Sequence, residues 1–495
     1  MRADPRQREP AGVLEGRFRA VAEPGPAGER RLRVPLAVID RAAALLVAEG
    51  ARFVTLFLAE QPEPSLVAVL AFRGALVVLR SPRGANTAYA SLAIDIPAAR
   101  WAERELHDLY QLTPLGHPDL RPLARPDADQ LRRRVIGPET FTIPYGPIRS
   151  GVFEAIQFVI ETGGEDVLAL ETRPFFKRRG LEQRFAGLSY EHGGHLAERI
   201  AGIASVAYAV AFAQAVERAL GAEVPRRAEV WRTVYAELER IANHLDVAAR
   251  LAEDPALAVG NARFAILKED ILRLQARLTG SRFARGIIVP GGVRAEGVVP
   301  LDELNRALDE FERDLVRDRK LLLRTTSFTD RLIGSGTLDR QTVDAFGAVG
   351  PVARAAGTAT DARFERPYAG YRRLGFELVT REDGDAMARL EVRFGEIDQS
   401  LHLLRQALDR LRRDPGDLLA DLPAGTGAAL GWAEAPQGEA VFWVEVADGE
   451  IALARIASPS FRNWQLFSES FRGDVLTDFA FIEHSFGLTP AGADR

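Results

Sequence analysis

Residues 191–217, EHGGHLAERIAGIASVAYAVAFAQAVE, decide how this chain folds. From Ile200 to Val216 the plainly polar side chains are Ser205 and Gln214. A helix that is apolar on every side lies either in a membrane or in a large protein core. At about seventeen residues, the run falls short of the roughly 20 apolar residues that a bilayer span needs. We therefore expect the central buried helix of a large soluble domain.

The bulk properties are those of a large globular protein. The chain has 495 residues, of which 47% are hydrophobic and 27% are charged, and this length leaves room for two or more domains. The net charge of -5 argues against nonspecific nucleic-acid binding. We see no uncharged apolar run of about 18 residues and no apolar segment near the N-terminus, so we expect neither a transmembrane helix nor a secretory signal.

Cysteine is absent from the chain. This excludes disulfides, cysteine-ligated iron–sulfur clusters and any thiolate-held nickel–iron centre within this polypeptide, because no other side chain supplies a thiolate. We therefore expect no cofactor and no metal on this chain.

The composition divides the chain into four segments. Residues 1–30 are rich in Pro, Gly and Arg and are expected to be disordered or loosely packed. Residues 31–121 alternate strand-like and helical patterns and predict a small α+β domain. Residues 122–142 lack periodicity and predict a linker, and residues 143–495 form a second, larger domain.

The end of the small domain carries a specific motif. WAERELHDLY at residues 101–110 is followed by GHPDLR at residues 116–121. This pattern resembles the signature of the smaller hydrophilic (30 kDa-like) subunit of respiratory complex I. His107 and His117 are interpreted as structural, because no nucleophile or metal-ligand spacing accompanies them.

The central stretch carries a second resemblance. RIAGIAS, residues 199–205, is similar to the R-I-C-G-I-C motif of the nickel–iron hydrogenase large subunit, with Ala201 and Ala204 in place of the cysteines. AFAQAVE resembles the same helix in hydrogenases and in the quinone-site (49 kDa-like) subunit of complex I. Aligned with the ending of energy-converting hydrogenases of the hydrogenase-4 and formate hydrogenlyase type, the chain has Thr489 and Gly492 at the other two cysteine positions. The resemblance thus implies that all four metal ligands are lost.

Further blocks extend this resemblance along nearly the whole second domain. They include GGV at residues 291–293 and the charged blocks between residues 350 and 400. The implied fold is α+β: a small N-terminal α+β domain fused to a large, mainly helical, hydrogenase-large-subunit-like domain with flanking β hairpins.

The resemblance also implies a set of candidate cavity residues. Arg149 stands where the family has a histidine, which in complex I is a ligand of the quinone headgroup, and Glu154 follows in the same block. Arginine is always charged at neutral pH, so Arg149 could bind an anion or a carbonyl oxygen, or pair with a carboxylate. The quinone-binding tyrosine of complex I aligns with Leu196, and Arg199 begins the lost cysteine motif.

His192 and His195 are also candidate cavity residues; they are three residues apart and could share one helix face. Two readings stay open, a metal site and polar packing near the helix start, because an HxxH pair without a third ligand is a weak metal signal. His244 is interpreted as a satisfied core or interface histidine.

The leading functional hypothesis is a subunit of a membrane-associated oxidoreductase related to complex I and to energy-converting hydrogenases. Its expected partners are an iron–sulfur small subunit, which holds the clusters, and integral membrane subunits that translocate protons or ions. The chain would be cytoplasmic and peripheral at the inner face of the plasma membrane. It would transfer electrons to a quinone or a small acceptor.

The alternative is a non-catalytic adapter or scaffold that couples the peripheral and membrane subunits, so whether the chain is itself an enzyme stays open. Family resemblance implies NAD and quinone binding, yet no Gly-rich dinucleotide fingerprint occurs. An active hydrogenase is excluded by the missing thiolates.

Overall fold

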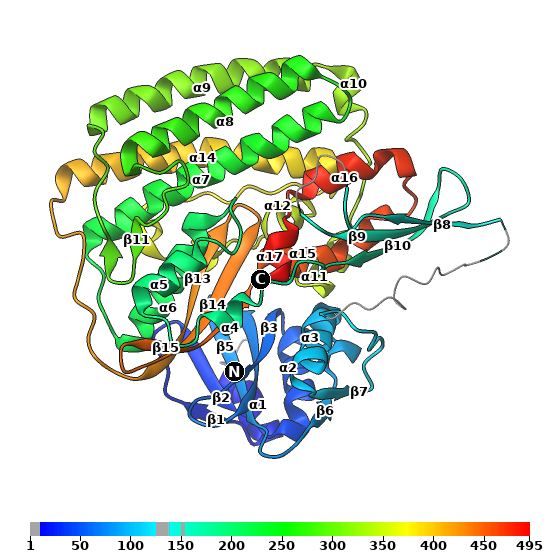
Figure 1. Cartoon of the computed structure of the whole chain (residues 1–495), viewed down its shortest axis with the longest axis vertical. Helices are drawn as coiled ribbons and strands as arrows, with labels where there is room; N and C mark the ends of the chain where they lie inside the picture. Colours follow the sequence, from blue (N-terminus) through cyan, green and yellow to red (C-terminus); the bar gives the residue numbers. More distant parts are fainter. Residues whose placement is uncertain (1–9, 125–136, 138, 150–153) are drawn as a thin grey trace, which may run out of the picture.

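The computed structural model describes residues 10–124, 137, 139–149 and 154–495. Figure 1 shows a small module built from the N-terminal quarter of the chain and, above it, a larger module crossed by long helices. The C-terminal helix α17 (Pro490–Asp494) lies where the two modules meet (Figure 1).

The N-terminal module is a five-stranded sheet in the order β1-β2-β5-β4-β3, in which β2 and β5 are parallel and the other pairs antiparallel. A second, two-stranded parallel sheet joins β6 and β7. The elements of the module are α1 (Pro10–Phe18), β1 (Val21–Glu23), β2 (Glu29–Arg33), α2 (Ile39–Ala48), β3 (Arg52–Ala59), β4 (Ser65–Phe72), β5 (Ala75–Pro82), β6 (Ala88–Ala90), α3 (Arg100–Tyr110) and β7 (Thr113–Leu115).

The sequence of strand β4 is apolar without the usual alternation of polar and apolar residues. All eight of its residues are buried, since both faces of the sheet are covered. Leu66, Ala68 and Leu70 face the helices of their own module, whereas Val67 and Val69 belong to the core of the second module. The sheet is therefore the layer that joins the two modules.

The prediction for residues 1–30 needs correction within the part that the structure describes. Residues 10–18 form α1, and residues 21–23 form β1, which pairs with β2. Leu14 and Ala20 are buried in the core of the N-terminal module. A few apolar side chains in an otherwise polar segment are enough to anchor it. Residues 1–9 lie outside the described residues.

The second module opens with a three-stranded antiparallel sheet in the order β10-β9-β8 and closes with another in the order β13-β14-β15. Between them lie the helices. The elements are β8 (Phe141–Tyr145), β9 (Gln157–Thr162), β10 (Val167–Arg173), α4 (Leu181–Arg184), α5 (Tyr190–Ala197), α6 (Ser205–Leu220), α7 (Arg226–Glu253), α8 (Ala258–Thr279), β11 (Ile288–Val289), β12 (Gly292–Val293), α9 (Leu301–Leu323), α10 (Thr326–Thr329), α11 (Arg340–Ala345), α12 (Gly350–Ala355), α13 (Ala362–Glu365), α14 (Ala386–Arg413), β13 (Gly427–Ala435), β14 (Gly438–Ala447), β15 (Glu450–Ala457), α15 (Pro459–Phe467), α16 (Phe479–Phe486) and α17. Short 3-10 turns link several of them: η2 (Leu36–Val38), η3 (Leu92–Ile94), η4 (Pro97–Ala99), η6 (Ala369–Arg373), η7 (Ser468–Phe471) and η8 (Leu476–Asp478).

The central apolar stretch forms two helices, α5 and α6, separated by a turn at residues 198–204. Helix α6 is buried from Ser205 to Glu217, as the apolar run predicts. It begins at Ser205, later than the apolar run itself, because the carboxylate of Glu239 accepts the first free N–H groups of the helix, those of Val206 and Ala207, at 2.7 and 3.0 Å.

The long helices α7, α8, α9 and α14 lie side by side across the top of the molecule in Figure 1. Helix α7 is almost entirely buried, whereas α9 exposes a charged face, as its sequence predicts. None of the described helices is both long enough and apolar enough to cross a bilayer.

Both hairpin turns predicted in the second domain are present. Gly163 and Gly164 connect β9 to β10, and Asp448 and Gly449 connect β14 to β15 with positive φ angles of 52° and 85°. With these hairpins flanking a mainly helical region, the predicted α+β fold class is confirmed. The division at residues 122–142 stays a prediction, and residues 125–136 and 138 lie outside the described residues.

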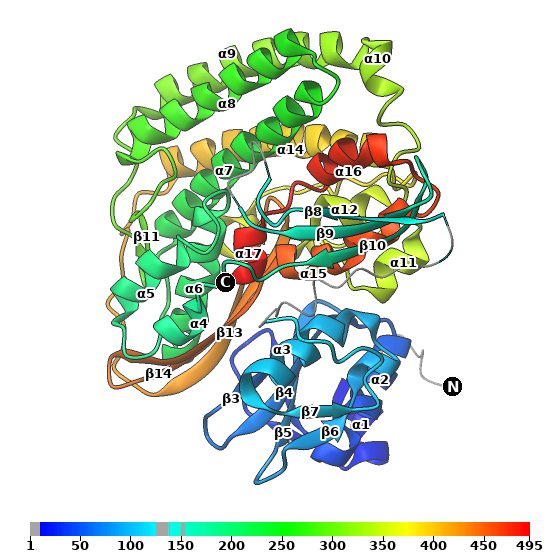
Figure 2. The same ribbon diagram turned by 45° about the vertical axis from the view of Figure 1, so that its right-hand side comes forward.

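Buried ion pairs hold the two modules together. Figure 2 shows the N-terminal module beneath the second one, on the side of α15 and the β8–β10 sheet. At their junction the carboxylate of Glu439 on β14 accepts from Arg52 at 2.7 Å, from Arg462 at 3.3 Å and also from Arg366. Burial alone would raise the pKa of Glu439, but these three guanidinium groups lower it well below its ordinary value. One carboxylate thus binds arginines from both modules.

Candidate functional site

Arg149 is held by an acidic partner from the far end of the chain. It follows β8, its side chain is 2% exposed, and its Nη1 and Nη2 donate to Glu483 Oε2 and Oε1 of α16 at 2.7 Å each. The guanidinium also lies 5.1 Å from the ring centres of both Tyr145 and Phe158. Burial lowers the pKa of Arg149, but the ion pair with Glu483 outweighs this effect and raises it.

Glu154 binds Thr489, one of the four positions that the resemblance aligns with metal-ligand cysteines; the four are called the lost positions below. Thr489 Oγ1 lies 2.8 and 2.7 Å from the two carboxylate oxygens of Glu154 and donates to them, and the N–H of Ala491 donates at 3.2 Å. The structure therefore brings Glu154 and Thr489, two of the residues singled out in the sequence, into direct contact across 335 positions of chain.

The other lost positions are closely packed. Ala201 and Ala204 lie in the turn before α6 and are 1% and 0% exposed. A Cβ added to Gly492 would lie 3.1 Å from Thr489 Cγ2 and within 3.2–3.3 Å of the hydroxyls of Ser460 and Ser458.

A guanidinium ties the turn to the tail. Arg179 Nη1 donates to the carbonyl of Arg199 at 2.8 Å, and Nη2 donates to the carbonyls of Ile200 at 2.5 Å and Ala491 at 2.7 Å. Burial lowers the pKa of Arg179, and the carboxylates of Asp494 and Glu154 partly offset this effect. A side chain of this chain therefore links the two segments that carry the lost positions.

The residues present do not fit a nickel–iron centre. The four positions offer two methyl groups, a hydroxyl that already donates to Glu154, and a glycine without a side chain. None of these is a thiolate, and soft metal centres of this kind depend on thiolate ligands. We derive no metal chemistry at this site. Across the described ranges, no group of three or more His, Cys, Asp or Glu residues is arranged to hold a metal ion.

The remaining candidate residues lie apart from Arg149. His192 is exposed and its Nδ1 lies 3.0 Å from Ser189 Oγ, while the His192 and His195 rings are 6.3 Å apart. Arg199 is exposed and donates to the carbonyl of His195, and Leu196 packs against the main core. These four residues of the α5 region do not line the cavity described next, so the predicted constellation is split into two places.

A cavity of about 230 Å³ opens beside Arg149 and Glu154. Its walls come from the turn before α6, from α7 and from the α16–α17 region, and it is lined by Arg149, Glu154, Ile203, Asn243, Asp246, Val247, Arg250, Trp464, Glu483, His484, Gly487, Leu488, Thr489 and Pro490. Asn243 is 6% exposed, and its Oδ1 has no hydrogen-bond partner among the described residues. Among the described residues, Trp464 Nε1 and Arg149 Nε also lack a partner, whereas the terminal nitrogens of Arg149 and the carboxylate of Glu154 are bonded.

Behind this cavity, His244 lies in a buried chain of charged groups. Arginine can only donate, so His244 Nδ1 accepts from Arg393 Nη1 at 3.2 Å, and Nε2 donates to Glu396 at 2.9 Å. Burial lowers the pKa of His244 to about 3, which leaves the ring neutral. This agrees with the prediction of a satisfied core histidine.

Sequence reasoning missed several residues of the cavity. Glu483, Asn243, Asp246 and Arg250 were not singled out, because none belongs to a recognisable motif on its own. No sequence pattern around Arg179 indicates that its side chain reaches the tail. A search for acidic residues able to neutralise a buried arginine could have suggested Glu483.

Comparisons with known proteins point to one family. The family described as "Respiratory-chain NADH dehydrogenase, 49 Kd subunit" matches residues 262–424, and the one described as "Respiratory-chain NADH dehydrogenase, 30 Kd subunit" matches residues 39–137. The 30 kDa match thus begins in the N-terminal module and the 49 kDa match lies in the second module. This is the order in which the corresponding motifs occur in the sequence.

Curated relatives include components of hydrogenases and of NADH–quinone oxidoreductases. Hydrogenase-4 component G of Escherichia coli is 30% identical, over 82% of this chain and 76% of that protein. Formate hydrogenlyase subunit 5 of the same organism is 29% identical over 82% and 77%. The C/D component of the NADH-quinone oxidoreductase of Rhodopseudomonas palustris is 29% identical over 86% and 85%.

Among solved structures, a chain of the membrane-bound sulfane sulfur reductase, an archaeal respiratory membrane complex, has a similar fold. The TM-score is 0.68 and the sequence identity 26%, over 73% of this chain and 100% of that chain. The fold, the sequence motifs and the relatives therefore all indicate the same family.

Proposed function

Because the chain belongs to the family that joins the 49 kDa subunit of respiratory-chain NADH dehydrogenase to the large subunits of membrane-bound hydrogenases, we propose that it is a peripheral subunit of such a membrane-bound complex. Its partners would be an iron–sulfur small subunit and integral membrane subunits that translocate protons or ions. It would lie at the inner, cytoplasmic face of the plasma membrane through these partners.

Within such a complex, the geometry best supports a non-catalytic adapter. The observation that carries this conclusion is the closure of the lost metal site: Arg179 links the turn at 199–204 to the tail, and Glu154 binds Thr489. Arg179, Glu154 and Thr489 thus make their hydrogen bonds to groups of this chain itself. The protein would then transmit conformational change between peripheral and membrane subunits, and the partners would store the electrons.

A second candidate is electron transfer from the partner's clusters to a quinone or small acceptor. The cavity of about 230 Å³ beside Arg149, with the free amide oxygen of Asn243, favours it. A quinone needs a dry slot and hydrogen-bond partners, not thiolates. Arg149 would have to release Glu483, at least in part, to contact such a ligand.

Quinone reduction by the purified complex separates the two candidates. The adapter predicts that the double variant Arg149→Met/Glu483→Gln, which removes both charges of the pair and keeps most of its volume, assembles and retains turnover. Loss of turnover in an assembled complex would instead establish the quinone site. Arg306→Met, at an exposed position of α9, is the matched control.

Membership in the complex has its own test. Affinity purification of the full chain followed by mass spectrometry should recover an iron–sulfur subunit and integral membrane subunits. A stable isolated polypeptide that turns over a redox substrate alone would contradict the proposal.

A further inference from the structure

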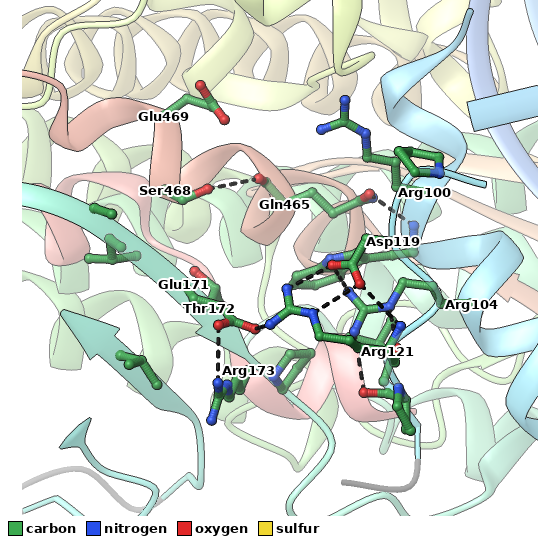
Figure 3. A pocket seen from close by; sticks show the side chains of 18 of the residues that line it. Arg100, Arg104, Asp119, Arg121, Glu171, Thr172, Arg173, Gln465, Ser468 and Glu469 are labelled. Carbon is green, nitrogen blue, oxygen red and sulfur yellow. Dashed lines mark hydrogen bonds and ion pairs between the residues drawn. The ribbon is translucent and has the colours of Figure 1, made fainter. Parts of the chain in front are cut away.

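A second and larger cavity lies where the two modules meet, away from Arg149. It has a volume of about 660 Å³, within the range of small-molecule sites. One wall comes from α3 and residues 117–123 of the N-terminal module, the other from β9, β10 and the α15–η7 region (Figure 3). Trp101, Leu123, Val159 and Phe346 contribute apolar surface.

Most charges on the floor of this cavity neutralise one another. Asp119 binds Arg121 at 2.7 Å and lies 3.8 Å from Arg104, and Glu171 binds Arg121 at 2.9 Å and Arg173 at 3.0 Å (Figure 3). Burial raises the pKa of Asp119, but its hydrogen bonds with Arg121 and the charge of Arg104 lower it to about 2. This ion chain closes the floor and leaves these groups little capacity to bind a ligand.

Glu161 on β9 also lines the cavity but takes no part in this ion chain. In the antiparallel register it lies opposite Ala169, while Val159 lies opposite Glu171, so all four side chains share the face that lines the cavity. Glu161 is 5% exposed, and its Oε2 has no hydrogen-bond partner among the described residues. A buried carboxylate oxygen without a partner is costly unless a ligand or water satisfies it.

Arg100 supplies the complementary charge from the other wall. It lines the cavity, and in Figure 3 its guanidinium points away from Asp119 and Arg121. Within the described residues its side chain has no ion pair, its Nε has no hydrogen-bond partner, and its nearest ring contact is Phe346 at 5.7 Å. The cavity therefore presents one unpaired cation on the side of α3 and one unpaired anion on the β9–β10 sheet.

We infer that this junction cavity binds a small dipolar ion of the amino-acid class, with its carboxylate on Arg100 and its ammonium group on Glu161. Such a ligand satisfies both unpaired groups at once, with charge-assisted bonds of the strong kind. The volume leaves room for an amino-acid side chain, which would contact Trp101 and Phe346. A purely anionic ligand would leave Glu161 buried and unpaired, and a purely cationic one would leave Arg100 unpaired.

The test is isothermal titration calorimetry of the full chain with each of the proteinogenic L-amino acids. At least one should bind saturably with one-to-one stoichiometry. Its N-acetyl derivative and its carboxamide should each bind about tenfold more weakly or worse, because each loses one charge-assisted bond. These arms use the unaltered protein and so do not depend on any variant folding.

Glu161→Gln and Arg100→Met should each weaken binding of the same amino acid by about tenfold. The exposed α9 positions give matched controls, Glu310→Gln and Arg306→Met, which should bind like the unaltered chain. The inference is overturned if no amino acid binds, if the blocked derivatives bind equally well, or if both cavity variants keep full affinity. Because this cavity is separate from the one beside Arg149, such a failure leaves the proposed function untouched.

Discussion

At the scale of single residues, one guanidinium joins two segments that lie far apart in the sequence. Arg179 makes its three bonds to main-chain carbonyls of residues 199, 200 and 491. Carbonyls are present whatever the side chains are, so the link tolerates alanine at residues 201 and 204.

Replacing Arg179 should therefore loosen both segments. We expect Arg179→Met to lower the free energy of unfolding by about 2–4 kcal/mol, because three carbonyls lose a charged donor. Hydrogen exchange should accelerate at residues 199–204 and 489–495 and stay unchanged in α9. Arg306→Met, on exposed α9, is the control. Unchanged exchange in the tail would show that Arg179 does not hold it.

Asp494 gives the tail a pH dependence. Its carboxylate accepts from the N–H groups of Phe175 at 2.8 Å and Lys177 at 3.3 Å, and burial raises its pKa from 3.8 to about 6. The folded protein thus binds the proton more tightly than the unfolded chain. Stability from this group falls as pH rises from about 4 to 6 and is level above that range.

The variant Asp494→Asn cannot titrate at this position. Relative to the unaltered chain it should gain stability progressively as pH rises from about 4 to 6, by on the order of 3 kcal/mol at most. Urea unfolding at several pH values measures the difference in stability between the variant and the unaltered chain. The titration of the other carboxylates is common to both proteins and cancels in this difference. A difference that does not change with pH would mean that Asp494 titrates alike in the folded and unfolded states.

At the scale of elements, the packing of α6 on β13 depends on a glycine. A Cβ added to Gly431 would lie 2.1 Å from the carbonyl oxygen of Ala211 and 2.5 Å from the amide nitrogen of Ala215. The helix backbone therefore touches the strand at this point, and neither can yield without moving the other.

Gly431→Ala should consequently lower the free energy of unfolding by about 3 kcal/mol or more, a large effect for one methyl group. Gly194→Ala in α5 is the matched control, since nothing lies within 4 Å of its added Cβ. It should be neutral or stabilise by up to about 1 kcal/mol, because alanine favours a helix. Thermal unfolding of both variants checks the contrast.

Element types were predictable where periodicity and turn chemistry agree. The apolar run of residues 200–216 predicts a buried helix, and Asp448-Gly449 predicts a hairpin. The start of α6 was not predictable, because it depends on Glu239, which lies on α7 more than thirty residues away. The structure of residues 10–23 was missed because composition outweighed the few apolar side chains that anchor it.

The candidate site was only partly predictable for a similar reason. Motif alignment selected Arg149, Glu154 and Thr489, and the structure places the last two in contact. No local pattern identifies Glu483 as the partner of Arg149, since 334 positions separate them. His192, His195 and Arg199 were also predicted to lie at the site, but none of them lines the cavity beside Arg149.

At the scale of the whole molecule, the junction of the two modules is built around Glu439. Arg52→Met should remove a buried charge partner and lower the free energy of unfolding by about 3 kcal/mol. The control is Arg33→Met, whose ion pair with Glu63 is exposed and should contribute less than about 1 kcal/mol. Chemical denaturation measures the free energy of unfolding of both variants. Equal losses would show that the ion pair at the junction contributes no more to stability than the exposed one.

The same carboxylate makes the folding of one module depend on the other. Expressed by itself, the N-terminal module would expose the apolar face of β4 and leave Arg52 without its counter-ion. The second module would keep Glu439 with two guanidinium groups rather than three. We therefore expect each module to depend on the other to reach its native fold.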